Sequence, residues 1–171
     1  MTVDIAHLLR AAGGSLVGKV RLQKVVYLLD QIGMNSGFEF DYHYYGPYSA
    51  ELTEAVDDAI VFSSVAEKIK SRVSDGVSYS VFEVEEDAAY PDDADELGDL
   101  DFSAARDAIR TMNNYSATVL ELAATINWLV CVEEEEDWKT ELQHRKGAKA
   151  SGGRTEEALK LLGELQLPPV D

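Results

Sequence analysis

Apolar residues recur every three to four positions in two stretches near the start of the chain, which is the period of an amphipathic helix. The first stretch, residues 3–12, ends at Gly13-Gly14. The second, residues 18–32, is followed by Gly33, a residue type favoured just beyond a helix C-terminus. Two helices are therefore predicted, and the apolar stripe of the second consists of Leu22, Val25, Val26, Leu29 and Ile32.

The pattern then changes to strict alternation between apolar and polar positions. Phe38, Phe40, Tyr42 and Tyr44 alternate with polar residues, which predicts a strand with one aromatic face and one polar face. Proline cannot donate to a strand ladder, so Gly46-Pro47 is predicted to end this strand.

A third helix and a β-hairpin are predicted next. Ser49 can cap the N-terminus of a helix. Residues 65–73 and 77–84 are rich in β-forming side chains and are separated by a turn with Asp75-Gly76, which is a hairpin signal. The first of these runs also fits a helical period. A hairpin after a short helix resembles a winged helix, but the match is loose because the predicted strand precedes the third helix instead of following the first.

The second half of the chain is predicted to be helical. Helices are expected at residues 101–112, 116–132 and 155–165, with a short one around Trp138 and Leu142. Two polar segments interrupt them, namely an acidic loop at 85–101, disordered in part, and a flexible basic loop at 145–154. The chain is thus expected to form a single domain over residues 1–171, of α+β class and predominantly helical, with a loosely winged-helix-like N-terminal half.

Charge narrows the choice of partners. The chain has 15 Lys and Arg against 32 Asp and Glu, a formal net charge of −17. Nucleic acid is therefore not an expected partner, because binding phosphates requires basic side chains. Most of the excess acid lies in residues 83–101 and 133–137, which leaves a modest basic patch at Arg145, Lys146, Lys149 and Arg154.

Location follows from what the chain lacks. It has one cysteine, Cys131, and therefore no internal disulfide or multi-cysteine metal site. No apolar run approaches the roughly 20 residues that span a bilayer, and the N-terminus lacks the basic and apolar regions of a signal peptide. A cytoplasmic protein without a membrane partner is expected.

The candidate binding residues fall into two short segments. Residues 42–49 contain four tyrosines, a side chain that offers a large amphipathic contact surface. Gln23, Lys24 and Tyr27 lie within one turn of the second helix, where a Gln-Lys pair usually faces solvent, although Lys24 could reach the aromatic strand. Tyr45 and Tyr48 are expected to point away from the core. The partner-binding candidates are Gln23, Lys24, Tyr27, His43, Tyr45, Gly46, Pro47 and Tyr48.

Catalytic signals are weak. The sequence has no His-Glu-x-x-His motif, no phosphate-cradling glycine loop and no Gly-x-Ser-x-Gly motif. Its three histidines are scattered, and His43 has no nearby ligand at metal-binding spacing. No enzymatic activity, metal or cofactor is expected.

The same two segments resemble a known group of bacterial proteins. Leu22-Gln23-Lys24 followed by Tyr27, and then Tyr45-Gly46-Pro47, resemble the Panacea (SocA-like) antitoxin domain. The longer patterns at residues 21–29 and 42–52 are closer still to the YwgA-like bacterial proteins. Panacea domains neutralise toxins, commonly by direct contact. The long acidic segment and the Tyr-Tyr-Gly-Pro-Tyr form of the second motif depart from the Panacea pattern.

Two classes of function remain. The leading hypothesis is a non-enzymatic protein-binding module, antitoxin-like or phage-defence-associated, that neutralises or chaperones a partner protein such as a toxin encoded nearby. The alternative is a nucleic-acid-associated regulator that uses the winged-helix-like half, or an acidic DNA mimic.

Overall fold

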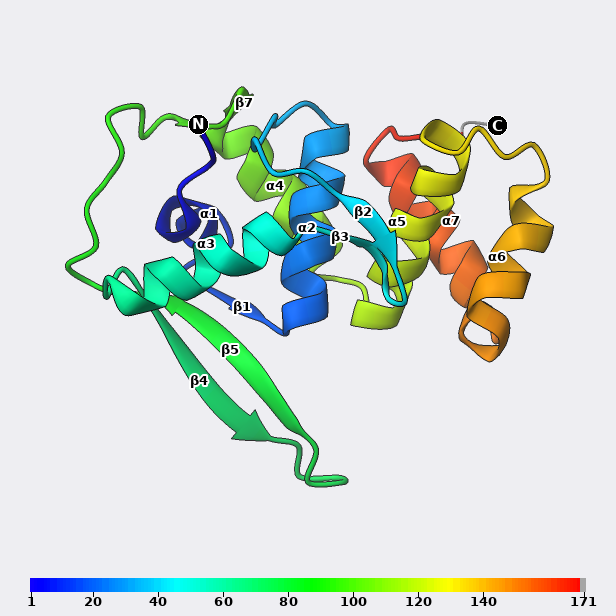
Figure 1. The fold of residues 1–171 in the computed structure, drawn as a ribbon, viewed down its shortest axis with the longest axis horizontal. Helices are drawn as coiled ribbons and strands as arrows, with labels where there is room; N and C mark the ends of the chain where they lie inside the picture. Colours follow the sequence, from blue (N-terminus) through cyan, green and yellow to red (C-terminus); the bar gives the residue numbers. More distant parts are fainter. Residues whose placement is uncertain (170–171) are drawn as a thin grey trace.

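The computed structural model describes residues 1–169 and confirms a mixed α+β fold that is mainly helical (Figure 1). The N-terminal half contains α1 (Ile5–Ala11), β1 (Ser15–Val17), α2 (Lys19–Gln31), β2 (Asp41–His43), β3 (Gly46–Tyr48), α3 (Ala50–Val61), β4 (Val65–Ser71) and β5 (Ser78–Val84). The C-terminal half contains β6 (Glu96–Leu97), β7 (Leu100–Asp101), α4 (Phe102–Met112), α5 (Ala117–Cys131), α6 (Trp138–Lys146), a 3-10 helix (Gly147–Ala150) and α7 (Arg154–Glu164).

The N-terminal half has the connectivity of a winged helix. Strand β1 lies between α1 and α2 and pairs antiparallel with β5, so the sheet order is β1-β5-β4. The β4–β5 hairpin projects from the helical body as a long wing (Figure 1). The predicted hairpin is therefore confirmed, and its first arm is a strand. Strand β1 gave no signal in the sequence because only Leu16 among its three residues is buried.

The aromatic strand is shorter than predicted and does not end at Gly46-Pro47. Residues 41–43 pair antiparallel with residues 46–48, so the Gly-Pro step starts a strand of its own. Tyr44 and Tyr45 form the turn, and Tyr44 is 81% exposed although the alternation placed it on the buried face. Residues 41–48 are called the tyrosine hairpin below.

Helix α5 forms the centre of the C-terminal half. It is buried on almost every side, including at Glu121, Thr125 and Asn127, as expected of a helix that is apolar around its whole circumference. Helices α2, α6 and α7 and strand β3 all pack against it. The tyrosine hairpin consequently lies between α2 and α5 (Figure 1).

The acidic segment carries more structure than predicted. Residues 96–97 and 100–101 form a small hairpin, and Leu97 is 1% exposed. The imidazole of His7 lies 3.0 Å from the carbonyl oxygen of Glu96, and two carbonyl oxygens of the segment accept from the Arg10 guanidinium. The segment therefore covers α1 and contributes to the core, even though its carboxylates face solvent.

The predicted basic loop at 145–154 is also wrong in its placement. Arg145 and Lys146 belong to α6, residues 147–150 form a 3-10 helix, and Arg154 begins α7. The sequence predicted a loop because the segment is polar and contains three glycines. Only residues 151–153 form a turn, and Lys146 is buried beside Glu121 of α5.

Candidate functional site

The conformation of the tyrosine hairpin depends on a glycine that packs closely on α5. Gly46 has φ +88°, and a Cβ atom placed there would lie 2.8 Å from the Thr125 hydroxyl oxygen. A side chain at this position would thus combine a strained backbone with a steric clash. Glycine lets β3 lie directly on α5 and brings the Pro47 carbonyl oxygen toward α2.

Gln23 ties the hairpin to helix α3. Its amide oxygen accepts from the backbone nitrogen of Ser49 (2.8 Å), and its amide nitrogen donates to the carbonyl oxygen of Ser49 (2.9 Å) and to the Thr53 hydroxyl (3.1 Å). Ser49 in turn caps α3 through its side chain. A single buried amide therefore fixes where α3 begins relative to α2.

Lys24 is buried beneath the hairpin. Its side-chain nitrogen donates to the Pro47 carbonyl oxygen at 2.6 Å, and the residue is 1% exposed. Burial lowers the pKa of Lys24 to about 8, and the nearby Glu121 carboxylate opposes part of this effect. The Gln-Lys pair does not face solvent as such pairs usually do, because both side chains serve as internal supports, and the expectation that Lys24 could reach the tyrosine segment is confirmed.

A second group of charges supports the hairpin from the C-terminal half. The Glu121 carboxylate lies 3.2 Å from the Lys146 nitrogen and 3.3 Å from the Lys149 nitrogen. Lys146 also donates to the Tyr44 carbonyl oxygen (3.0 Å), and the Lys149 nitrogen lies 4.8 Å from the centre of the Tyr45 ring. Arg145 lies over the Tyr42 ring and is paired with two carboxylates of its own half. These contacts hold the hairpin in one orientation.

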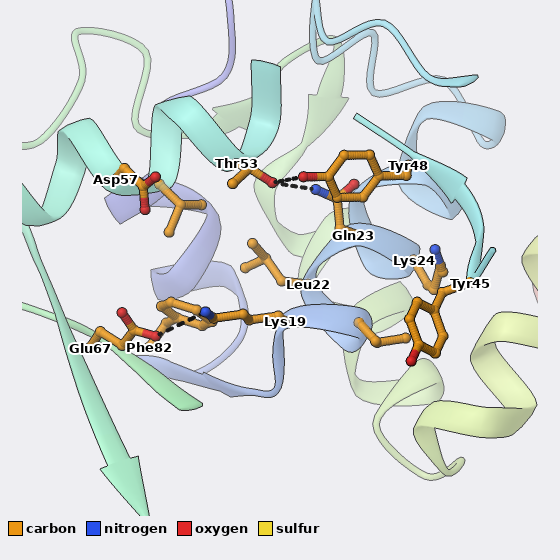
Figure 2. A pocket seen from close by; sticks show the side chains of 12 residues that line it. Lys19, Leu22, Gln23, Lys24, Tyr45, Tyr48, Thr53, Asp57, Glu67 and Phe82 are labelled. Carbon is orange, nitrogen blue, oxygen red and sulfur yellow. Dashed lines mark hydrogen bonds and ion pairs between the residues drawn. The ribbon is translucent and has the colours of Figure 1, made fainter. Parts of the chain in front are cut away.

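An open cavity of about 440 Å³ lies beside this supported hairpin, between α2, α3 and the base of the wing (Figure 2). We call it the α2–α3 groove. Its floor is mainly apolar, with Leu22, Val56 and Phe82, and its rim carries Tyr45, Asp57 and Glu67. Figure 2 shows that the Tyr48 and Gln23 side chains meet at Thr53, whereas Lys19 pairs with Glu67 at 3.9 Å. The remaining lining residues are Val20 and Lys24.

Five of the eight candidates lie away from the molecular surface. Gln23, Lys24, Tyr27, Gly46 and Pro47 are all buried. The Tyr27 hydroxyl donates to Asn127 at 2.9 Å, and burial raises its pKa. These five residues position the hairpin, and Gln23 and Lys24 also form part of the wall of the α2–α3 groove.

The other three candidates reach the surface. Tyr45 is 51% exposed, His43 is exposed, and Tyr48 is half-buried with its ring centre 4.9 Å from that of His43 in a tilted contact. The structure brings Tyr45 and Tyr48 to the groove together with Leu22, Val56, Phe82 and Asp57. Sequence reasoning missed the last four. The helical period predicted Leu22 as part of an apolar stripe, but nothing in the sequence placed Val56 of α3 or Phe82 of the wing beside it.

The basic patch and a metal site are less well supported as functional sites. The basic patch is largely neutralised from within, because Arg145, Lys146 and Lys149 all pair with carboxylates and Arg154 donates to backbone carbonyl groups. Within residues 1–169, no group of three or more His, Cys, Asp or Glu side chains is arranged to hold a metal ion. None of the helices in that range is long and apolar enough to cross a membrane.

The chain is similar along most of its length to a bacterial protein. A protein of Bacillus subtilis (strain 168), described as uncharacterized protein YwgA, is 28% identical over 153 residues, which make up 90% of this chain and 89% of that protein. No family model matches the chain. The similarity supports the YwgA-like resemblance of the two motifs, and it extends well beyond them.

Proposed function

We propose that this protein is a non-enzymatic, antitoxin-like protein-binding module that holds an apolar segment of a partner protein in the α2–α3 groove. The observation that carries the proposal is the groove itself, a cavity of about 440 Å³ with an apolar floor beside two tyrosines. Tyrosine and buried apolar pockets are enriched at the centres of protein interfaces. The resemblance to the Panacea domain agrees with this reading, and a toxin encoded nearby is the partner it implies.

The rigid support of the hairpin favours binding. Side chains that are already fixed lose less conformational freedom when a partner arrives, so more of the contact energy contributes to affinity. Tyr45 sits on a turn that is held by Lys146 and Lys149, and Tyr48 is fixed by the Thr53 hydroxyl. The buried polar network therefore holds the groove surface in one conformation.

The winged-helix connectivity favours the alternative of a nucleic-acid-binding regulator, but the charge of α3 opposes it. In that arrangement α3 would be the helix presented to DNA, and its exposed side chains include Glu51, Glu54, Asp57 and Asp58, with no Lys or Arg in the helix. Carboxylates facing a phosphate backbone are repelled. Protein binding is the better-supported function.

The test takes as partner a small protein whose gene adjoins the gene of this chain. We expect the two purified proteins to associate in isothermal titration, and co-expression to relieve any toxicity of the partner. The double variant Tyr45→Ala, Val20→Ala removes apolar surface at the groove and is expected to weaken binding by at least tenfold.

The matched control is Tyr90→Ala, because Tyr90 is an exposed tyrosine on the acidic segment and does not line the groove. It should bind as the unmodified protein does. If the groove variant keeps full affinity while the control loses it, the binding surface lies elsewhere and the proposal fails. Thermal unfolding of both variants shows whether any loss of affinity reflects loss of the fold.

A further inference from the structure

One flank of the α2–α3 groove is a stripe of carboxylates. Glu54 and Asp57 are three residues apart on α3 and both exposed, so they are neighbours on one face and form the α3 stripe, whereas Glu51 and Asp58 lie farther round the helix. Asp57 lies at the groove itself. Helix α3 contains no basic residue, and the stripe therefore gives this flank a strongly negative potential.

The basic side chains at the groove are already engaged. The Lys19 nitrogen lies 3.9 Å from the Glu67 carboxylate, and the Lys24 nitrogen is buried and directed at the Pro47 carbonyl oxygen (Figure 2). Neither compensates the α3 carboxylates. The rim thus presents negative charge to an incoming segment, around a floor that is apolar.

The apolar surface continues beyond the cavity. Val61 lies one turn after Asp57 on the same helix face, and Val61 and Phe62 are 74% and 80% exposed. Ile69 is also exposed and lies two residues after Glu67, on the same face of β4. Exposed apolar side chains next to a cavity are typical of an interaction surface.

We propose that the occupant of the α2–α3 groove is a basic amphipathic helix of the partner, with its apolar face on the floor and its Lys or Arg residues along the α3 carboxylates. This inference rests on the proposed function and adds the chemistry of the partner. From Thr53 to Val61, α3 provides about 12 Å of flank, which matches about two turns of a partner helix. Apolar residues spaced i, i+3 or i+4, and i+7 would meet the floor.

The free edge of β4 argues for a helix and against an added strand. Strand β4 pairs only with β5, so its outer edge is open. That edge carries exposed Lys68 and Lys70, and lysines on an edge strand oppose pairing with another strand. A basic segment along α3 meets carboxylates of opposite charge at Glu54 and Asp57.

The first experiment uses designed peptides as probes with the full chain. A fluorescent amphipathic helix of Leu and Lys, roughly four turns long, is compared with a Leu and Glu peptide of the same pattern and with a scrambled Leu and Lys peptide. Fluorescence anisotropy should show that the first peptide binds at least tenfold more tightly than either of the others. Equal binding of the Leu and Glu peptide, or of the scrambled peptide, would overturn the inference.

The second experiment changes charge on the protein. Glu54→Lys, Asp57→Lys reverses two charges on the α3 stripe, and Glu134→Lys, Glu136→Lys makes the same change in net charge at exposed acids outside the groove. We expect the first pair of substitutions to lower the affinity for the Leu and Lys peptide at least tenfold. The second pair should lower this affinity less than threefold. Equal losses would show only a general attraction to an acidic protein, and the inference would be abandoned.

Two further outcomes separate this inference from the proposed function. If Tyr45→Ala, Val20→Ala weakens binding of the neighbour-encoded protein but no basic peptide binds, the groove is confirmed and the basic helix is wrong. If light scattering shows the chain alone to be a dimer that the Glu54→Lys, Asp57→Lys variant disperses, the occupant is a second copy of this chain, and the inference of a basic partner helix is overturned.

Discussion

Lys24 makes the most direct test of the supporting network, because its charge is buried under the tyrosine hairpin. Its pKa is lowered from the ordinary 10.5 to about 8, mainly by burial. Below pH 8 the folded protein must keep a buried ammonium charged, which costs stability. Above pH 8 the folded state releases the proton while the unfolded chain still holds it, so the free energy of unfolding rises with pH until about 10.5.

The size of the effect follows from the difference between the two pKa values. Each pH unit between them contributes about 1.4 kcal/mol, so the full window amounts to about 3 kcal/mol, and the part between pH 8 and 9.5 to about 2 kcal/mol. The Lys24→Met variant keeps the apolar stem without a titrating group. The free energy of unfolding of the unmodified protein should therefore rise relative to that of Lys24→Met by about 2 kcal/mol over this range.

Urea unfolding of both proteins at intervals from pH 7 to 9.5 measures this difference. Burial raises the pKa of the Cys131 thiol, and this group is present in both proteins, so its contribution cancels in the difference. A difference that stays flat would show that Lys24 titrates normally, and one that falls with pH would show that the network stabilises its charge. If Lys24→Met does not fold, a direct NMR titration of the Lys24 side-chain nitrogen in the unmodified protein decides between the same outcomes.

Two further predictions concern stability, and urea unfolding tests both. Gly46→Ala should lower the free energy of unfolding by about 2 kcal/mol or more, because the new methyl group combines a positive φ with a close approach to Thr125. The double variant Gly46→Ala, Thr125→Ala should recover only part of this loss. Full stability of the single variant would refute the steric account. In the acidic segment, Leu97→Ala should lower the free energy of unfolding by about 2 to 4 kcal/mol. Replacing residues 90–93 with glycine and serine should change it by less than about 1 kcal/mol. A larger loss from the second change than from the first would contradict the burial of Leu97.

The sequence by itself determined the local elements of this protein. Helices α2, α5 and α7 carry strong apolar periods, Ser49 and Ser116 cap the helices that they precede, and Asp75-Gly76 marks the turn of the wing. These signals come from interactions within a few residues of each other, so they can be read in one dimension. The sequence likewise located the two motifs around Gln23 and the tyrosine hairpin.

Only the tertiary structure decided what those motifs do. Helical spacing placed Gln23 and Lys24 beside the apolar stripe, and polar side chains there ordinarily face solvent. They are buried because the tyrosine hairpin and the start of α3 close over them and provide the carbonyl acceptors of Pro47 and Ser49. The groove likewise exists only because β1 pairs with β5 and brings Phe82 of the wing against Leu22 and Val56. Contacts between residues so distant in the chain leave no periodic pattern, and the packing of whole elements sets them.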